Sequence, residues 1–139
     1  MKVVETLTKK IFAPYKPVAS GLFAIPAVHP GWKSGNWSGY ALKKAKKNSF
    51  YSISGYWIVP RVKPSKQNKY SSVWIGIDGF NNASLIQTGT EQDYVNGKAV
   101  YYPWWEILPE PETTISLPVS PNDLMFAKIS KLNNSTFAA

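Results

Sequence analysis

The residue of this chain whose type and setting best suit chemistry is Gln87. It lies in the string Leu-Ile-Gln-Thr-Gly at residues 85–89, which is typical of a short strand with one amide among apolar neighbours. A buried glutamine must satisfy both donors and acceptors, so it is seldom placed for packing alone. Its amide donates hydrogen bonds without titrating, which suits the stabilisation of an oxyanion. The alternative interpretation is a structural amide that ties two strands together.

Two carboxylates are candidates to work with Gln87. Glu106 follows two tryptophans and precedes Ile107, and a carboxylate in such a place could act as a general base, line a cleft or serve structure alone. Asp78 ends the string Trp-Ile-Gly-Ile-Asp-Gly at residues 74–79, which predicts a buried strand and a turn. Its simplest role is to accept backbone hydrogen bonds in that turn. The alternative is support of Gln87 from nearby.

Tryptophans accompany these polar residues along the chain. Large aromatic side chains are mostly core residues, but one or two could form the floor of a peptide cleft on a concave sheet. A carbohydrate-binding module also offers an aromatic-lined concave sheet, and it is the rival interpretation. The tryptophans considered for the cleft are Trp37, Trp74, Trp104 and Trp105.

Composition excludes several kinds of catalytic site. The sequence has no cysteine, which rules out disulfides, thiolate nucleophiles and metal sites with cysteine ligands. Its single histidine is His29, in a proline-rich segment. A Ser-His-Asp triad or a histidine-based zinc site would need His29, and no partner pattern accompanies it. We expect it to be an exposed loop residue.

The formal net charge is +8, with basic residues gathered in two places. A basic patch with nearby aromatic side chains could bind nucleic acid or an anionic surface. No nucleic-acid motif accompanies the clusters, and both lie in turn-like stretches, so we expect solvated loops and no nucleic-acid partner. No run is long and apolar enough to span a membrane. The clusters are Lys43, Lys44, Lys46 and Lys47, and then Arg61, Lys63, Lys66 and Lys69.

The elements that must position these residues are short strands. Eleven prolines and nine glycines in 139 residues argue against a helical bundle. The alternation of residue types predicts strands, and Asn96-Gly97 is the strongest hairpin signal. We therefore predict an all-β fold, an antiparallel β-sandwich. The predicted strands are 37–42, 50–59, 71–77, 84–88, 92–95, 99–107, 113–117 and 124–132.

Five motifs in order resemble one family, the glutamic peptidases called eqolisins. They are the two strings above, together with Asn-Trp-Ser-Gly-Tyr-Ala at 36–41, Gly-Tyr-Trp-Ile-Val-Pro at 55–60 and Tyr-Pro-Trp-Trp-Glu-Ile-Leu-Pro at 102–109. The resemblance runs from about Asn36 to about Ile129. It implies a fold of two large antiparallel sheets, like the concanavalin-type lectins. It also implies acid-acting endopeptidase activity on polypeptides, with a water-activating glutamine–glutamate pair, no covalent intermediate, and neither cofactor nor metal.

The resemblance assigns one member of that pair. Gln87 matches the family's glutamine. The family's glutamate lies much later, in a segment like Ala-Glu-Trp-Ile-x-Glu, and this sequence has no such string. Glu106 matches a glutamate of the family that is not the catalytic one, so we expect it to line the cleft or serve structure. The expectation is that residues 36–139 are the N-terminal part of a peptidase domain, incomplete at its C-terminus and inactive or weak alone. An inactive remnant or an interaction domain is a further alternative.

Residues 1–35 form a distinct segment. They carry four prolines and no sustained periodicity, which predicts a leader, a propeptide or a poorly ordered tail. The first ten residues lack the apolar core of an ordinary secretory signal. The resemblance implies secretion, so localisation stays open, as does the oligomeric state.

Overall fold

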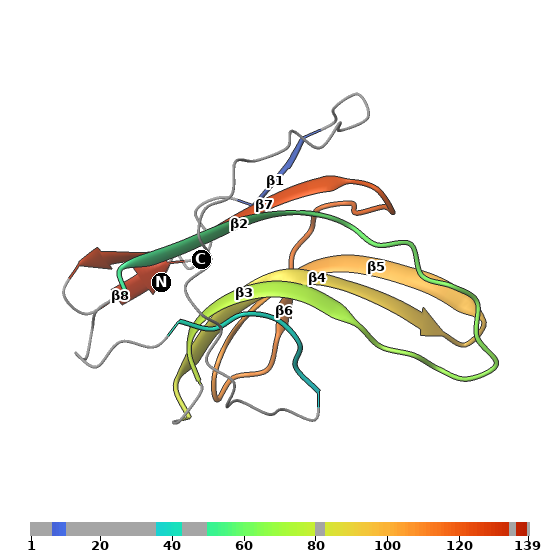
Figure 1. Ribbon diagram of the computed structural model, residues 1–139, viewed down its shortest axis with the longest axis horizontal. Helices are drawn as coiled ribbons and strands as arrows, with labels where there is room; N and C mark the ends of the chain where they lie inside the picture. Colours follow the sequence, from blue (N-terminus) through green and yellow to red (C-terminus); the bar gives the residue numbers. More distant parts are fainter. Residues whose placement is uncertain (1–6, 11–35, 43–49, 80–82, 134–135, 139) are drawn as a thin grey trace. The chain divides into compact units, whose positions relative to one another are not determined.

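A computed structural model describes residues 7–10, 36–42, 50–79, 83–133 and 136–138, and they belong to two units (Figure 1). One unit comprises Met1–Phe12 and Phe50–Ala139, and the other comprises Ala13–Ser49. In the second unit only residues 36–42 are described, and they contain no strand. The strand expected at residues 37–42 is therefore wrong, although residue types alternate there. His29 and the first basic cluster lie outside the described residues.

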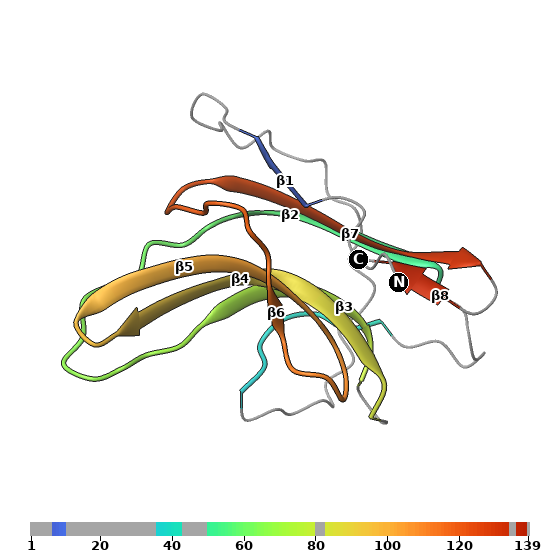
Figure 2. The same ribbon diagram turned by 180° about the vertical axis from the view of Figure 1, so that it is seen from behind.

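The described residues of the first unit are all β, which confirms the predicted fold class. They form two antiparallel sheets, and none of them is helical (Figures 1 and 2). In one sheet β7 lies between β1 and β2, and β8 also pairs with β7. The other sheet has the order β3-β4-β5-β6. The strands are β1 Leu7–Lys10, β2 Ser52–Ile58, β3 Ser72–Asp78, β4 Leu85–Val95, β5 Lys98–Ile107, β6 Thr113–Thr114, β7 Leu124–Asn133 and β8 Thr136–Ala138.

The alternation of exposed and half-buried side chains along the strands explains why the two sheets face each other. Along β2, exposed residues alternate with half-buried ones such as Ile53 and Trp57. Successive side chains of a strand point to opposite faces, so one face of β2 is available for the core. Ile53 packs against a cluster of Ile86 from β4 and Ile129 from β7. Because β4 and β7 belong to different sheets, this cluster is the interior between the sheets.

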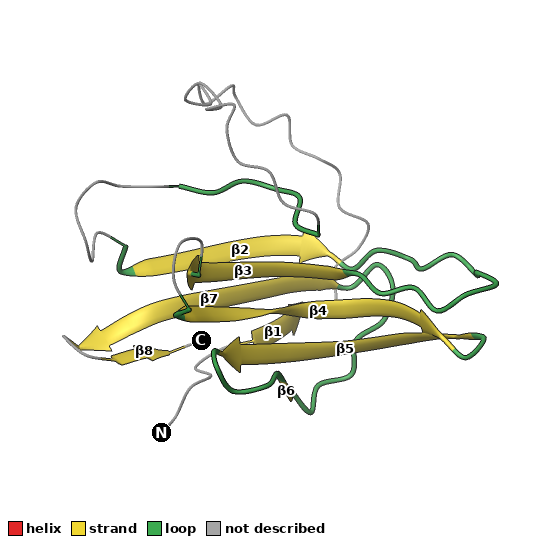
Figure 3. Ribbon diagram, turned by 90° about the horizontal axis from the view of Figure 1, so that it is seen from below, coloured by secondary structure: helices red, strands yellow, loops and turns green. Residues whose placement is uncertain are grey.

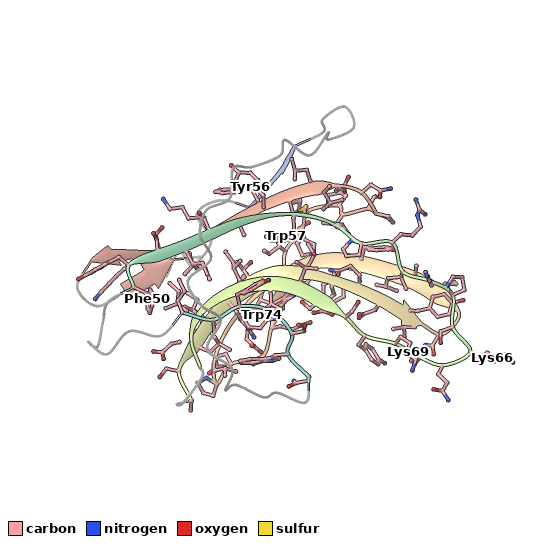
Figure 4. The ribbon with its side chains drawn as sticks, in the orientation of Figure 1. Phe50, Tyr56, Trp57, Lys66, Lys69 and Trp74 are labelled. Carbon is pink, nitrogen blue, oxygen red and sulfur yellow. The ribbon has the colours of Figure 1, made fainter. Side chains whose placement is uncertain are left out.

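A polar contact also joins the two sheets. The indole Nε1 of Trp57 donates a hydrogen bond of 2.9 Å to Oγ1 of Thr90, which lies on β4 and is fully buried. Figure 4 shows Trp57 in the space between the sheets. The side chain of Gln92 donates to the same hydroxyl oxygen at 2.8 Å. A buried hydroxyl that accepts two donors avoids the cost of unsatisfied polar groups, so the interior contains polar atoms without loss of stability.

Strands β4 and β5 form the long hairpin that the Asn96-Gly97 signal predicts (Figure 3). Both turn residues have positive φ, 51° and 79°, as a two-residue hairpin turn requires. One prediction is wrong here: residues 84–88 and 92–95 are one strand of 11 residues, β4. Gly89 lies in its middle and pairs with Trp74 on β3 and Trp104 on β5.

Gly89 lies inside this strand because the backbone of β3 approaches it closely. A Cβ atom added there would collide with the carbonyl oxygen of Val73 and lie 2.7 Å from Cβ of Trp74. We expect Gly89→Ala to lower the free energy of unfolding by about 1–3 kcal/mol, the usual range for an overpacked interior. The matched control is Gly55→Ala on β2, whose Cβ would meet only the Ile75 side chain, at 3.1 Å. Chemical denaturation measures both, and equal stability of the two variants would contradict the argument.

Among the remaining elements β7 agrees with expectation, whereas β1, β6 and β8 do not. β6 comprises only Thr113–Thr114 of the strand predicted at 113–117, whereas β7 matches residues 124–132 to within one residue. Leu7–Lys10 pairs with β7, although we predicted no strand before residue 36. None of the described segments forms a helix that could cross a lipid bilayer.

Candidate active site

The candidate site lies on the face of the β3–β6 sheet that points away from the other sheet. Ile86 and Thr88 are buried neighbours of Gln87 on β4, and Ile86 belongs to the interior cluster. Alternation therefore directs Gln87, which is half-buried, to the opposite face. On that face its neighbour on β3 is Gly76 and its neighbour on β5 is Glu106.

Gln87 and Glu106 form a direct side-chain contact. Nε2 of Gln87 donates a hydrogen bond to Oε2 of Glu106. Both residues are half-buried. A hydrogen bond to a carboxylate is stronger than one between neutral groups, and it strengthens where water is partly excluded. The structure thus brings together the amide and one of the two carboxylates singled out in the sequence.

Trp74 lies on the other side of Gln87. A Cβ atom added at Gly76 would be 3.1 Å from Cζ3 of the Trp74 indole and 3.2 Å from Cβ of Gln87. An atom of the six-membered ring of Trp74 and the Cβ of Gln87 therefore both border the space over Gly76. Figure 4 labels this tryptophan on β3. Gln87 has a carboxylate bonded to its amide on the β5 side and an aromatic ring near its stem on the β3 side.

The other tryptophans considered in the sequence have different positions. Trp104 is only 4% exposed and pairs with Gly89 on the face of Gln87; among the described residues its Nε1 has no hydrogen-bond partner. Trp105 pairs with Thr88, so alternation directs it to the opposite face from Gln87. Trp37 is 39% exposed and belongs to the other unit.

Asp78 ends β3 in a left-handed conformation, with φ of 75°, and Gly79 follows with φ of 82°. Its carboxylate oxygen Oδ1 accepts a hydrogen bond of 3.2 Å from the backbone N–H of Gly79. Asp78 is exposed and pairs with Leu85, two residues before Gln87. Asp78 thus satisfies the first backbone donor that follows β3.

An acidic group on the same face was not predicted. Glu91 lies four residues beyond Gln87, about 13 Å along the strand, and pairs with Ser72 and Tyr102. The hydroxyl of Tyr102 donates a hydrogen bond of 3.0 Å to Glu112. Burial raises the pKa of Glu91 to about 7; a hydrogen bond from Ser72 opposes the rise, and nearby Asp93 and Glu112 add to it. Burial also raises the pKa of Tyr102.

The turn at Asn96-Gly97 could have revealed both pairs. A two-residue turn pairs Val95 with Lys98, and every later pair in the hairpin follows from that register. Counting outward places Gln87 opposite Glu106 and Glu91 opposite Tyr102. Two separate strands at 84–88 and 92–95 would interrupt this register, so the pairs follow only when β4 is continuous.

The raised pKa of Glu91 makes stability depend on pH. Because its folded-state pKa lies above its ordinary value of 4.5, the folded protein binds the proton more tightly than the unfolded chain. This contribution to stability is complete below about pH 4.5 and is lost as pH rises through about 7. We expect the free energy of unfolding to fall over that window and Glu91→Gln to flatten the fall. Denaturant titrations across pH 4–8 measure it, with the exposed Glu110→Gln as control. A fall of the same size in the Glu91 variant would contradict the assignment.

The second basic cluster lies in the connection between β2 and β3. Its four cationic residues are all exposed, and Figure 4 labels Lys66 and Lys69 in this loop. The backbone of Lys69 bridges to Tyr94 on β4. In the structure this cluster lies on a surface loop. Lys69 places the loop beside the turn end of the β4–β5 hairpin, away from Gln87.

Comparison with known proteins gives one family and two relatives. The model of the Peptidase A4 family matches residues 35–139. Aspergillopepsin-2 of Aspergillus niger is 30% identical over 94 residues, which cover 66% of this chain and 27% of that protein. An uncharacterized protein of Methanocaldococcus jannaschii is 32% identical over 82 residues, which cover 56% of this chain and 8% of that protein. The chain thus spans about a quarter or less of the length of these relatives. No solved structure matches it.

Proposed function

The chain belongs to the Peptidase A4 family, the eqolisins, and on that premise we propose that it is a glutamic endopeptidase domain in which Gln87 stabilises the oxyanion. Membership implies hydrolysis of peptide bonds in a polypeptide substrate. The observation that carries the assignment of Gln87 is its position on the outer face of the β3–β6 sheet, with its amide bonded to Glu106. The matching Leu-Ile-Gln-Thr-Gly string supports the same residue.

The proposed chemistry is direct attack of water on the scissile carbonyl carbon. A carboxylate takes a proton from the water as the new carbon–oxygen bond forms. The carbonyl oxygen becomes negatively charged, and an N–H of Gln87 donates a hydrogen bond to it. The tetrahedral intermediate then expels the amine as the C–N bond breaks, and the amine nitrogen takes the proton that the carboxylate removed from water. The reference pKa of a glutamate is about 4.3, so a glutamate base is ionised in mildly acidic solution.

We further propose that the base is not one of the residues of this sequence. In the family the base lies in a segment like Ala-Glu-Trp-Ile-x-Glu, and these 139 residues contain no such string. On this proposal the chain alone is inactive or weak, because it supplies the oxyanion donor without the group that activates water.

Cleavage of an unfolded protein as a function of pH tests the proposed function. The assay compares the chain alone with an extended form that carries an Ala-Glu-Trp-Ile-x-Glu segment. Hydrolysis by the extended form in mildly acidic solution that requires Gln87 supports the proposal. Absence of hydrolysis by both forms leaves a remnant or an interaction domain. Binding of an oligosaccharide without hydrolysis would favour the carbohydrate-binding interpretation.

A further inference from the structure

An oxyanion donor made from a glutamine must present the correct end of its amide. The oxygen and nitrogen ends have nearly the same size and shape, so packing alone distinguishes them poorly. Only the nitrogen end donates hydrogen bonds; the oxygen end would repel a developing negative charge. If Gln87 acts as proposed, another group must decide which end faces the substrate.

The hydrogen bond to Glu106 provides that selection. An ionised carboxylate only accepts hydrogen bonds, so it pairs favourably with the nitrogen end of the Gln87 amide and unfavourably with the oxygen end. The nitrogen carries two hydrogens. One is used in the bond to Oε2 of Glu106, and the second remains for another acceptor. The cross-strand register of β4 and β5 places the two side chains directly opposite, so the contact needs no loop to form.

Trp74 limits the other motion of Gln87. A Cβ atom added at Gly76 would lie 3.1 Å from Cζ3 of Trp74 and 3.2 Å from Cβ of Gln87. The indole ring and the Gln87 stem therefore border the same small space. This ring restricts swings of the Gln87 stem toward β3, while the bond to Glu106 holds the amide toward β5. The stem and the amide are therefore restrained by different strands.

From these contacts we propose that Glu106 is a positioning residue, which fixes the orientation of the Gln87 amide so that one N–H stays available to the oxyanion. The inference rests on the proposed function of Gln87. It differs from a role of Glu106 as the base, because a positioning residue needs only to accept a hydrogen bond. Glu106→Gln leaves a side-chain oxygen that can still accept that bond, whereas Glu106→Leu leaves no acceptor.

Nuclear magnetic resonance of the side-chain amides of the whole chain tests the proposal. The sequence has three glutamines, so selective labelling gives three amide signals. Gln67 is exposed, and Gln92 is buried and bonded to Thr90. They supply a solvated and a buried reference in the same spectrum. The variants are Glu106→Gln and Glu106→Leu, with Gln87→Leu to assign the signal.

We expect one Nε2 proton of Gln87 in the unmodified chain to resonate downfield of the Gln67 protons and to exchange more slowly with solvent. Glu106→Gln should retain part of that shift, Glu106→Leu should abolish it, and Gln92 should be unchanged in both. A Gln87 signal like that of Gln67, or a shift that survives Glu106→Leu, would overturn the proposal. If the Gln92 signal also shifts, backbone amide spectra show whether the change is confined to the Glu106 contact or extends through the sheet. A rearranged sheet would contradict the proposal.

The result separates this inference from the proposed function. The amide signals report orientation whether or not the chain hydrolyses peptides. The amide signals could show an oriented Gln87 while Gln87→Ala leaves the cleavage rate unchanged. That result would support the Glu106 contact and refute the oxyanion role of Gln87. In an active extended form, Glu106→Gln should lower turnover less than Glu106→Leu, because glutamine still accepts the bond but can also donate one, and so selects the end of the Gln87 amide less strictly. A loss there of a hundred-fold or more would instead identify Glu106 as the base.

Discussion

Replacing Gln87 by alanine is expected to lower turnover of an active extended form about a hundred- to a thousand-fold. Loss of one oxyanion donor costs about 2.7–4 kcal/mol of transition-state stabilisation. The donor meets a full negative charge only in the tetrahedral intermediate, so the loss should fall mainly on kcat, with KM little changed. Steady-state kinetics on a defined peptide in acid measure both constants.

The control for this variant is Gln67→Ala. Gln67 is an exposed glutamine outside the β4–β5 hairpin, so its removal tests loss of a glutamine amide as such. Both variants should keep the circular dichroism of the parent, and only Gln87→Ala should lower the unfolding midpoint, because it removes the hydrogen bond to Glu106. Equal turnover of parent and Gln87→Ala would refute the assignment of the oxyanion donor.

Supplying the glutamate segment should raise cleavage about a hundred- to ten-thousand-fold over the chain alone. That range is the usual contribution of a general acid–base group. The chain alone already contains Gln87, Glu106 and Trp74, so the comparison isolates the added carboxylates from the rest of the site. Release of peptides from an unfolded protein at about pH 3–4, near the reference pKa of glutamate, gives the measurement.

The matched control changes each added glutamate to glutamine, which preserves size and removes the base. One of these forms should fall back to the rate of the chain alone. If the chain alone already cleaves as fast as the extended form after removal of contaminating peptidases, the base has been misplaced, and Glu106 becomes the first candidate.

The local sequence pattern predicts the strands of this fold better than it predicts the contacts between them. The alternation along residues 52–58 and the Asn96-Gly97 turn depend on near neighbours, and both predictions are confirmed. The two separate strands predicted at 84–88 and 92–95 are instead one strand with Gly89 inside it, although glycine is uncommon inside strands. The reason it is tolerated is the approach of the β3 backbone, which no nearby residue encodes. At Gly89, the tertiary contact with β3 outweighs the low strand preference of glycine.

The candidate site shows the same division. Gln87 was identified from its own neighbours, and its contact with Glu106 follows from the hairpin register once β4 is continuous. The position of the Trp74 ring over Gly76 depends on the pairing of β3 with β4 across an intervening turn. That turn requires Asp78 in a left-handed conformation, which is uncommon for a residue other than glycine. Sequence pattern alone therefore does not predict the position of the Trp74 ring near Gln87.

The hairpin that carries Gln87 and Glu106 also makes their encounter an early event in folding. The two residues are 19 positions apart and joined through one tight turn. Closing so short a segment costs little chain entropy compared with bringing together the two sheets, and isolated hairpins form in about 1–10 μs. The pair has low contact order, whereas the interior contact of Ile86 with Ile129 joins distant parts of the chain. We therefore expect the amide and its carboxylate to come into register before the two sheets pack together.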